Sequence, residues 1–169
     1  MEIRFVGQND DLREISNIYE RSWKYAYRGI IPQEYLDSIP EGRWAKSITR
    51  EGMNSLVVVE EGRFVGTASF CRSRWEKYSG FGEIVSIYFV PEFMGKGYGR
   101  LLLERCIEEL GALGFTELLL WVLEENTRAR RFYERNGFEC SGEFLNDNIG
   151  GKEIREVMYR LSIELRKKS

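Results

Sequence analysis

The fold of this chain is indicated most clearly by the segment Val90-Pro91-Glu92-Phe93-Met94-Gly95-Lys96-Gly97-Tyr98-Gly99-Arg100. A β-type apolar run over residues 84–90 ends at the proline, and a helical pattern begins after the three glycines. Glycine has no Cβ, so the backbone N–H groups of such a loop can close around an anion. The helix that follows adds unpaired N–H groups and the positive end of its dipole. The segment therefore predicts a strand, a phosphate-binding loop and a helix, in that order.

Hydrophobic periodicity on both sides of this segment predicts the other elements of the fold. Strands are expected over residues 3–6, 56–60, 64–71, 83–90, 117–123, 139–145 and 154–163, with a turn at 146–151. Helices are expected over residues 12–22, 34–39, 41–50, 99–113 and 127–136. Because no linker or repeat separates these elements, residues 1–169 are expected to form a single domain of the α/β (α+β) class. Its centre is a mixed, mostly antiparallel sheet of about six to seven strands flanked by helices.

The composition excludes several classes of protein. The 169 residues are 43% hydrophobic and 31% charged, which is typical of a soluble globular domain. The net charge of −2 gives no basic field that would attract nucleic acid. No apolar run approaches the ~18 residues of a membrane span, and the first residues lack the apolar segment of a signal peptide. We therefore expect a cytoplasmic protein that binds neither nucleic acid nor membranes.

Histidine and cysteine usage limits the chemistry that the chain can perform. The chain has no histidine, which removes Ser-His and Cys-His nucleophile pairs and the commonest ligand of transition metals. Its three cysteines, Cys71, Cys106 and Cys140, lack the spacing of a metal site, so we expect reduced thiols and no metal. Any general base must then be a carboxylate, a tyrosine, a lysine or a water molecule.

Two motifs together resemble the GCN5-related N-acetyltransferase (GNAT) family. The first is the strand, loop and helix around residues 95–100, which is similar to the family's acyl-CoA pyrophosphate loop, Gln/Arg-x-x-Gly-x-Gly/Ala, with Met94 in place of the Gln or Arg. The second is residues 126–138, which match the family pattern Asn-x-x-Ala-x-x-Phe-Tyr-x-x-x-Gly-Phe. The resemblance covers residues 3–161 and implies a GNAT-like acyl-CoA acyltransferase fold.

The resemblance implies that acetyl-CoA is the co-substrate. Backbone N–H groups and one basic side chain would hold its pyrophosphate in the segment made of Gly95, Lys96, Gly97, Tyr98, Gly99 and Arg100. The backbone of Ile87, Tyr88 and Phe89 would pair with the pantetheine arm as another strand does, and an amide there would polarise the thioester carbonyl. Asn126 would contact the cofactor near the thioester, and it can also cap its own helix.

The resemblance also implies two catalytic residues. Tyr133 lies seven residues after Asn126, two helical turns along, and matches the acid that protonates the departing thiolate. A phenol suits this role if the proton transfer is concerted or its pKa is lowered. Glu83 lies fourteen residues before Gly97, the spacing at which the family's histone acetyltransferases carry a base glutamate. The alternatives to Glu83 as a base are a water chain and a carboxylate that is simply solvated.

The resulting hypothesis is an N-acetyltransferase that moves an acetyl group from acetyl-CoA to a primary amine by direct attack in a ternary complex. The acceptor is expected to be a small-molecule amine, bound by Glu34, Asp37 or Glu41 and by aromatic rings of the first helices. These rings belong to Trp23, Tyr25, Tyr27, Tyr35 and Trp44. The alternatives are a protein N-terminal or lysine acetyltransferase, a non-catalytic acyl-CoA-binding sensor, and a protein that binds another phosphorylated ligand. Because members of the family often form dimers, a homodimer is a further expectation.

Overall fold

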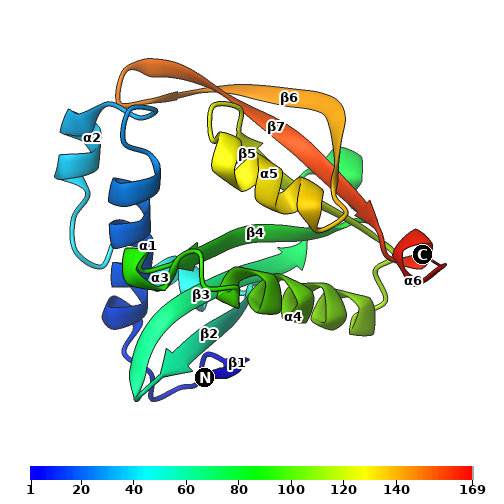
Figure 1. Ribbon diagram of the computed structural model, residues 1–169, viewed down its shortest axis with the longest axis horizontal. Coiled ribbons are helices and arrows are strands. Elements are labelled where there is room, and N and C mark those ends of the chain that lie inside the picture. The colour runs from blue at the N-terminus through cyan, green and yellow to red at the C-terminus, as the bar shows by residue number, and fades with distance from the viewer. Residues whose placement is uncertain (169) are drawn as a thin grey trace.

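Seven strands form one sheet in the computed structural model, which describes residues 1–168 and the side chains of residues 1–166. The strands are β1 (Glu2–Phe5), β2 (Asn54–Glu60), β3 (Arg63–Arg72), β4 (Gly82–Phe89), β5 (Glu117–Leu123), β6 (Glu139–Ile149) and β7 (Lys152–Ser162). Their order across the sheet is β1-β2-β3-β4-β5-β7-β6, and every neighbouring pair is antiparallel except β4 and β5. The expected mixed, mostly antiparallel sheet is therefore confirmed (Figure 1).

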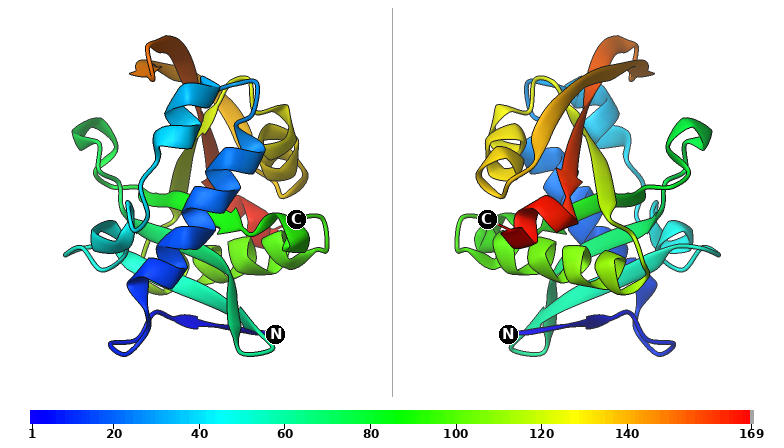
Figure 2. Two further views of the ribbon diagram at one scale, coloured as in Figure 1. Left: turned by 90° about the vertical axis from the view of Figure 1, so that its left-hand side faces the viewer. Right: turned by 90° about the vertical axis from the view of Figure 1, so that its right-hand side faces the viewer.

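Helices cover both faces of this sheet (Figure 2). They are α1 (Leu12–Ala26), α2 (Gln33–Ser38), α3 (Ala45–Ile48), α4 (Tyr98–Ala112), α5 (Thr127–Arg135) and α6 (Ile163–Lys168), with short turns η1 (Glu76–Tyr78) and η2 (Pro91–Phe93). None of the described helices has the length and apolar character that crossing a membrane requires. The Tyr19 hydroxyl of α1 lies 3.1 Å from the Ser69 hydroxyl on one face. On the other face a Cβ at Gly82 would lie 2.9 Å from the Leu110 side chain of α4, so α1 and α4 lie on opposite faces.

The core explains why the central strands do not alternate between apolar and polar residues. Leu56, Val57 and Val58 of β2 are all fully buried, because helices cover the strand on both sides. Leu102 and Leu103 of α4 are equally buried against the sheet. Burial of each such side chain contributes roughly 1.5–3 kcal/mol to folding. The strands that carry the site are therefore held in place by a well-packed core.

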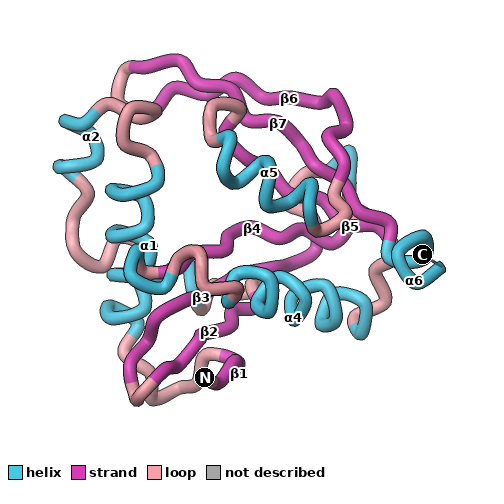
Figure 3. Tube along the Cα trace, in the orientation of Figure 1, coloured by secondary structure: helices cyan, strands magenta, loops and turns pink. Residues whose placement is uncertain are grey.

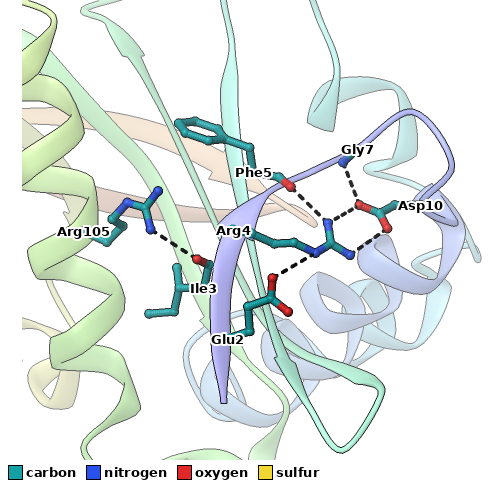
Figure 4. Close-up of polar contacts among 7 residues, drawn as sticks. All are labelled: Glu2, Ile3, Arg4, Phe5, Gly7, Asp10 and Arg105. Carbon is teal, nitrogen blue, oxygen red and sulfur yellow. Dashed lines mark hydrogen bonds and ion pairs between the residues drawn. The ribbon is translucent and has the colours of Figure 1, made fainter.

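The N-terminal strand is held by polar contacts at both ends (Figure 4). Arg4 donates hydrogen bonds to both carboxylate oxygens of Asp10, at 2.7 and 2.9 Å, and the Gly7 N–H donates to the same carboxylate at 2.7 Å. The hydrogen bond from Arg4 is the main reason that the pKa of Asp10 lies below its ordinary value. Arg105 of α4 donates to the carbonyl oxygen of Ile3 at 3.2 Å. The contacts of Arg4 join β1 to the segment before α1, and the contact of Arg105 joins it to α4.

The sheet opens between β4 and β5, and this opening positions the site. The two strands pair in parallel only where Gly82 meets Leu118 and Glu83 meets Leu119. Beyond these pairs they diverge (Figure 1), and the remaining β5-facing edge of β4 has no strand partner among the described residues. A register shift against β3 leaves Val85 as an extra residue in β4. Because a β-bulge bends and twists its strand, the bulge at Val85 accounts for the divergence.

The hairpin of β6 and β7 corrects one expectation from the sequence. A turn was expected over residues 146–151, but the strands pair as far as Ile149 with Lys152 (Figure 3). The turn consists of Gly150 and Gly151 alone, both with positive φ, 62° and 86°. Two such residues form the type I′ turn that suits the right-handed twist of a tight hairpin. The polar residues just before it read as a turn, yet they are strand residues on an exposed hairpin.

Candidate functional site

A cleft with a volume of about 1390 Å³ lies where β4 and β5 part. Its lining includes Val85 of β4 and Val122 of β5, the start of α4, residues along the length of α5, and the C-terminal half of α1. Since α4 and α1 lie on opposite faces of the sheet, the cleft passes through the sheet and joins its two faces. The volume exceeds the roughly 300–1,000 Å³ of an ordinary small-molecule site, so the cleft has room for two ligands at once.

The glycine loop forms one end of the cleft, with Gly95, Gly97, Gly99 and Arg100 in its lining. Gly97 is the N-cap of α4 in a left-handed conformation, with φ of 85°, and no side chain caps the helix. The first N–H groups of α4 are therefore left for a ligand, at the positive end of the helix dipole. A Cβ at Gly97 would have open space around it, so an anion can approach the backbone there. This loop fits a phosphate group, as the sequence predicts.

The two basic residues of the loop differ in whether their side chains reach the cleft. The Lys96 ammonium lies 4.7 Å from the centre of the Phe93 ring, and the Tyr98 ring stacks on the same ring with a centroid distance of 6.0 Å. Of the two basic residues in the predicted loop, only Arg100 lines the cleft. Arg128 of α5 also lines it, with a guanidinium nitrogen 3.9 Å from where a Cβ of Gly95 would lie. Arg128 is a phosphate-binding candidate that sequence reasoning missed, because it occupies a variable position of the second motif.

The outer half of β4 forms the wall between the two ends. Ile87, Tyr88 and Phe89 all line the cleft, on the part of β4 that has left β5. Their pairing with β3 uses one edge of the strand and leaves the other edge open to an extended ligand. The Tyr88 hydroxyl accepts a hydrogen bond from Trp23 Nε1 at 3.1 Å and lies 3.5 Å from the hydroxyl of Tyr27. Burial raises the pKa of Tyr88, so this phenol stays neutral.

Helix α5 brings Asn126 and Tyr133 to the same cleft. Asn126 caps the helix, since its side-chain oxygen accepts a hydrogen bond from the Ala129 N–H at 3.2 Å. The Tyr133 ring packs against Phe132 and Phe138, with centroid distances of 5.2 and 5.9 Å. The Tyr133 hydroxyl makes no hydrogen bond within the described part of the chain. The capping role of Asn126 is thus present in the structure, and its contact with a cofactor stays a prediction.

Burial raises the pKa of Tyr133 well above its ordinary value, and Tyr88 and Cys106 make smaller contributions in the same direction. The phenol therefore does not ionise at neutral pH, and it cannot act as an acid through a lowered pKa. Of the two conditions that the sequence allowed, only a concerted proton transfer agrees with this environment.

Glu83 is buried beside an arginine and not on the cleft surface. Its side chain is 1% exposed, and one oxygen accepts a hydrogen bond from the Arg74 N–H at 3.0 Å. The other oxygen accepts from Arg74 Nε at 3.2 Å and from Nη2 at 2.7 Å. Arg74 lines the cleft, whereas Glu83 does not. The predicted base thus has both oxygens engaged, and its catalytic role stays a prediction.

The far end of the cleft is aromatic, as expected. Trp23, Tyr25, Tyr27 and Trp44 line it, whereas Tyr35 does not. The Trp23 ring lies 4.9 Å from Tyr27 and 5.2 Å from Trp44, so these rings form a continuous wall.

The carboxylates expected at this end lie elsewhere. Glu34, Asp37 and Glu41 are absent from the described lining of the cleft. Asp37 instead accepts a hydrogen bond from Gln33 one helical turn away. The carboxylate at this end is Glu156 of β7, which sequence reasoning missed, because a glutamate in an alternating strand resembles any solvent-facing residue.

The β6–β7 turn lies beside α2 and the segment before it (Figure 1). Lys152 Nζ donates to the carbonyl oxygen of Ile30 at 2.8 Å and pairs with a Glu125 oxygen at 3.2 Å. At Gly150, an added Cβ would lie 2.6 Å from the Cβ of Tyr35. Tyr35 therefore builds the closure of this end instead of its inner wall.

Replacing Gly150 by alanine is expected to disturb this closure. The added methyl group would force Tyr35 away, and overpacking of this kind costs roughly 1–3 kcal/mol. Gly151→Ala is the matched control, because Gly151 also has a positive φ but nothing lies within 4 Å of an added Cβ. Thermal unfolding should show the larger loss of stability for Gly150→Ala, and equal losses for the two variants would contradict the contact.

Comparisons with known proteins agree with this geometry. The sequence model of the acetyltransferase (GNAT) family matches residues 12–138 of this chain. An uncharacterized N-acetyltransferase of Bacillus subtilis is 34% identical over 152 residues, covering 88% of this chain and 86% of the relative. A spermidine N(1)-acetyltransferase of Thermoplasma acidophilum is 26% identical over 155 residues, covering 89% and 92%. The crystal structure of an N-acetyltransferase from Thermoplasma acidophilum in complex with coenzyme A superposes with a TM-score of 0.72 at 21% identity, covering 96% of this chain and 99% of that one.

Proposed function

The chain belongs to the acetyltransferase (GNAT) family and is an acetyl-CoA-dependent N-acetyltransferase, and we propose that it acetylates the primary amine of a small molecule. The observation that carries the proposal is the cleft through the sheet, because it joins a phosphate-binding loop on one face to an aromatic chamber on the other. A thioester that enters along β4 and an amine held by the aromatic wall would meet beside Tyr133. Direct attack in a ternary complex needs this arrangement and no covalent intermediate on the enzyme.

The cofactor part of the proposal follows the placement of the open backbone groups. The uncapped N-terminus of α4 and the loop made of Gly95, Lys96, Gly97, Tyr98, Gly99 and Arg100 would hold the pyrophosphate of acetyl-CoA. The free edge of β4 at Ile87, Tyr88 and Phe89 would pair with the pantetheine arm, as an added strand does. Asn126 would contact the same arm with the amide nitrogen that helix capping leaves unused.

Tyr133 is proposed as the acid of the reaction. Its hydroxyl would give a proton to the leaving sulfur as the carbon–sulfur bond breaks, because the phenol with its raised pKa stays protonated until that moment. Glu83 is the base that the sequence predicts, and the contacts with Arg74 would have to loosen for it to accept a proton.

A small acceptor is favoured by the closed end of the cleft. The contacts of Lys152 and Gly150 join the β6–β7 turn to the region of α2, which leaves little room for a folded protein. The relative from Thermoplasma acidophilum is named for acetylation of spermidine, a small amine. Both observations favour a small-molecule amine over a protein N-terminus or a lysine side chain.

Three broader expectations stay part of the proposal. We propose that residues 1–169 act as one domain in the cytoplasm, and the free thiols of Cys71, Cys106 and Cys140 agree with a reducing compartment. We also keep the homodimer as a proposal, because β6 lies at the edge of the sheet with Phe144 49% exposed. An edge strand of this kind offers backbone groups to a second copy.

The proposal is tested by release of free thiol from acetyl-CoA with a panel of acceptors. The panel contains spermidine, single amino acids, and peptides that carry either a free N-terminus or an internal lysine. We expect kcat/KM for at least one small amine to exceed that for every peptide by tenfold or more. A preference for peptides would support the protein acetyltransferase, and binding of acetyl-CoA without release by any acceptor would support the sensor; either would contradict the proposal.

A further inference from the structure

The described residues that line the cleft include two carboxylates, Glu104 and Glu156. Glu104 forms an ion pair with Arg166 between α4 and α6. Glu156 makes no hydrogen bond or ion pair with its side chain in the described part of the chain, although it is partly buried. A partly buried carboxylate without a partner costs free energy unless a ligand compensates its charge. Among the described residues, Glu156 is therefore the one cleft carboxylate without a charged partner, and its position relative to the reacting groups indicates what it could do.

The fold places Glu156 on the acceptor side of the sheet. It pairs with Leu123 of β5, and side chains of directly paired residues lie on the same face. Leu123 packs in a cluster with Ile31 and Leu36, on the side of α1 and α2. The next residue of β7, Val157, points to the opposite face, because side chains alternate along a strand. Glu156 thus faces the aromatic chamber and not the phosphate-binding loop.

The surroundings of Glu156 connect it to the reacting end of the cleft. Its negative charge contributes to the raised pKa of Tyr27 and of Tyr88, so it lies close to both phenols. Tyr133, the proposed acid, also contributes to the raised pKa of Tyr27. Glu156 and the three tyrosines all line the same cleft, which also holds the proposed position of the thioester.

The charges that face Glu156 favour a carboxylate that can take up a proton. Burial is the main cause of its raised pKa, and the negative charges of Asp147 on β6 and Glu83 on β4 raise it further. Arg74, in the connection between β3 and β4, lowers it, but this guanidinium is already bound to Glu83. The neighbours at the end of α1 and on β4 are Tyr27 and Tyr88, two phenols whose raised pKa keeps them neutral.

We propose that Glu156 receives the ammonium group of the acceptor and takes the proton that the amine must lose before it attacks. The inference rests on the proposed function and names the acceptor class, a primary amine that enters as a cation. It assigns to Glu156 the role that the sequence predicted for Glu83. Glu83 then fixes Arg74 and keeps that guanidinium from occupying the carboxylate of Glu156.

The proton and bond changes balance in this scheme. The ammonium gives one proton to Glu156, and the freed lone pair of nitrogen forms a bond to the thioester carbon. The carbon–sulfur bond breaks, and the sulfur takes a proton from the hydroxyl of Tyr133. The second proton lost by nitrogen goes back to the Tyr133 oxygen, and Glu156 releases its proton to solvent. The products are the acetamide, free CoA and one proton.

The test compares Glu156→Gln with Glu153→Gln, an exposed position on the same strand that removes the same charge. For the unmodified chain, kcat/KM for the amine should rise with pH through the raised pKa of Glu156, because only the ionised carboxylate accepts a proton. Glu156→Gln should lower this constant about 100-fold at neutral pH and remove that limb of the profile. Glu153→Gln should change neither, and Glu156→Asp should restore the limb with part of the rate.

Two further readouts separate this role from a structural one. The dissociation constant of acetyl-CoA, measured by calorimetry, should stay within about twofold in Glu156→Gln, whereas that of the amine in the presence of CoA should rise about tenfold. An unchanged pH profile in Glu156→Gln would overturn the inference, and so would a limb that disappears in Glu83→Gln instead. Absence of thiol release by the unmodified chain with every amine would instead refute the proposed function.

Discussion

Tyr133→Phe is expected to lower kcat for amine acetylation by about 10²–10³-fold, with KM for acetyl-CoA within about twofold. The substitution removes one oxygen from the cleft and leaves the ring packed against Phe132 and Phe138. Because burial raises the pKa of Tyr133, the hydroxyl keeps its proton across the neutral range. The activity of the unmodified chain should therefore show no loss from Tyr133 ionisation as the pH rises from 7 to 9. Initial rates of thiol release across this range measure both effects.

Tyr159→Phe is the matched control for this variant. Tyr159 is fully buried and does not line the cleft, and its hydroxyl accepts from Arg130 at 2.9 Å and donates to Glu134 at 2.7 Å. Its loss should lower the stability of the fold by about 1 kcal/mol and leave kcat nearly unchanged. Full turnover by Tyr133→Phe at every pH would show that this phenol gives no proton to the leaving sulfur.

Gly97→Asp is expected to weaken acetyl-CoA binding by about 100-fold or more. The new carboxylate would stand at the uncapped start of α4, where the account places the pyrophosphate. Two unit charges about 4 Å apart repel by about 4 kcal/mol near a protein surface, more than the ~2.7 kcal/mol of a 100-fold change. The space around a Cβ at this position is open, so the side chain fits. Calorimetric titration with acetyl-CoA measures the loss.

Gly97→Asn separates the charge from the backbone. Asparagine and aspartate have the same shape, and both tolerate the left-handed conformation that Gly97 adopts, with φ of 85°. The asparagine variant should bind acetyl-CoA within about tenfold of the unmodified chain. Added salt should narrow the difference between the two variants, because it screens the repulsion. Equal affinities for Gly97→Asp and Gly97→Asn would argue against a phosphate at the start of α4.

Local sequence signals predicted most of the fold because each depends on neighbouring residues. β5 has the expected bounds, Glu117–Leu123, and α4 begins one residue before the expected 99, at the cap that Gly97 forms. The expected turn of the β6–β7 hairpin, residues 146–151, begins too early, because the strands of this hairpin are exposed and rich in polar residues. In such strands, alternation carries little information about where pairing stops.

The site was predictable where its residues belong to one motif and not where they meet through the fold. The glycine loop and Tyr133 lie in continuous motifs, and the cleft brings them together. The pairing of Glu83 with Arg74 depends on a loop that folds back on its strand, which no spacing in the sequence encodes. Glu156 reaches the acceptor side only because β7 is inserted between β5 and β6, a long-range pairing that periodicity cannot reveal. The opening of the sheet itself depends on a single bulge at Val85.

The most direct test of the account is an initial-rate experiment in which acetyl-CoA and the preferred amine are varied together. The proposed arrangement has both substrates in one cleft that crosses the sheet, with direct transfer between them. It therefore predicts double-reciprocal lines that intersect, as a ternary complex requires. Parallel lines would indicate an acetylated enzyme that forms before the amine binds, and would contradict the account.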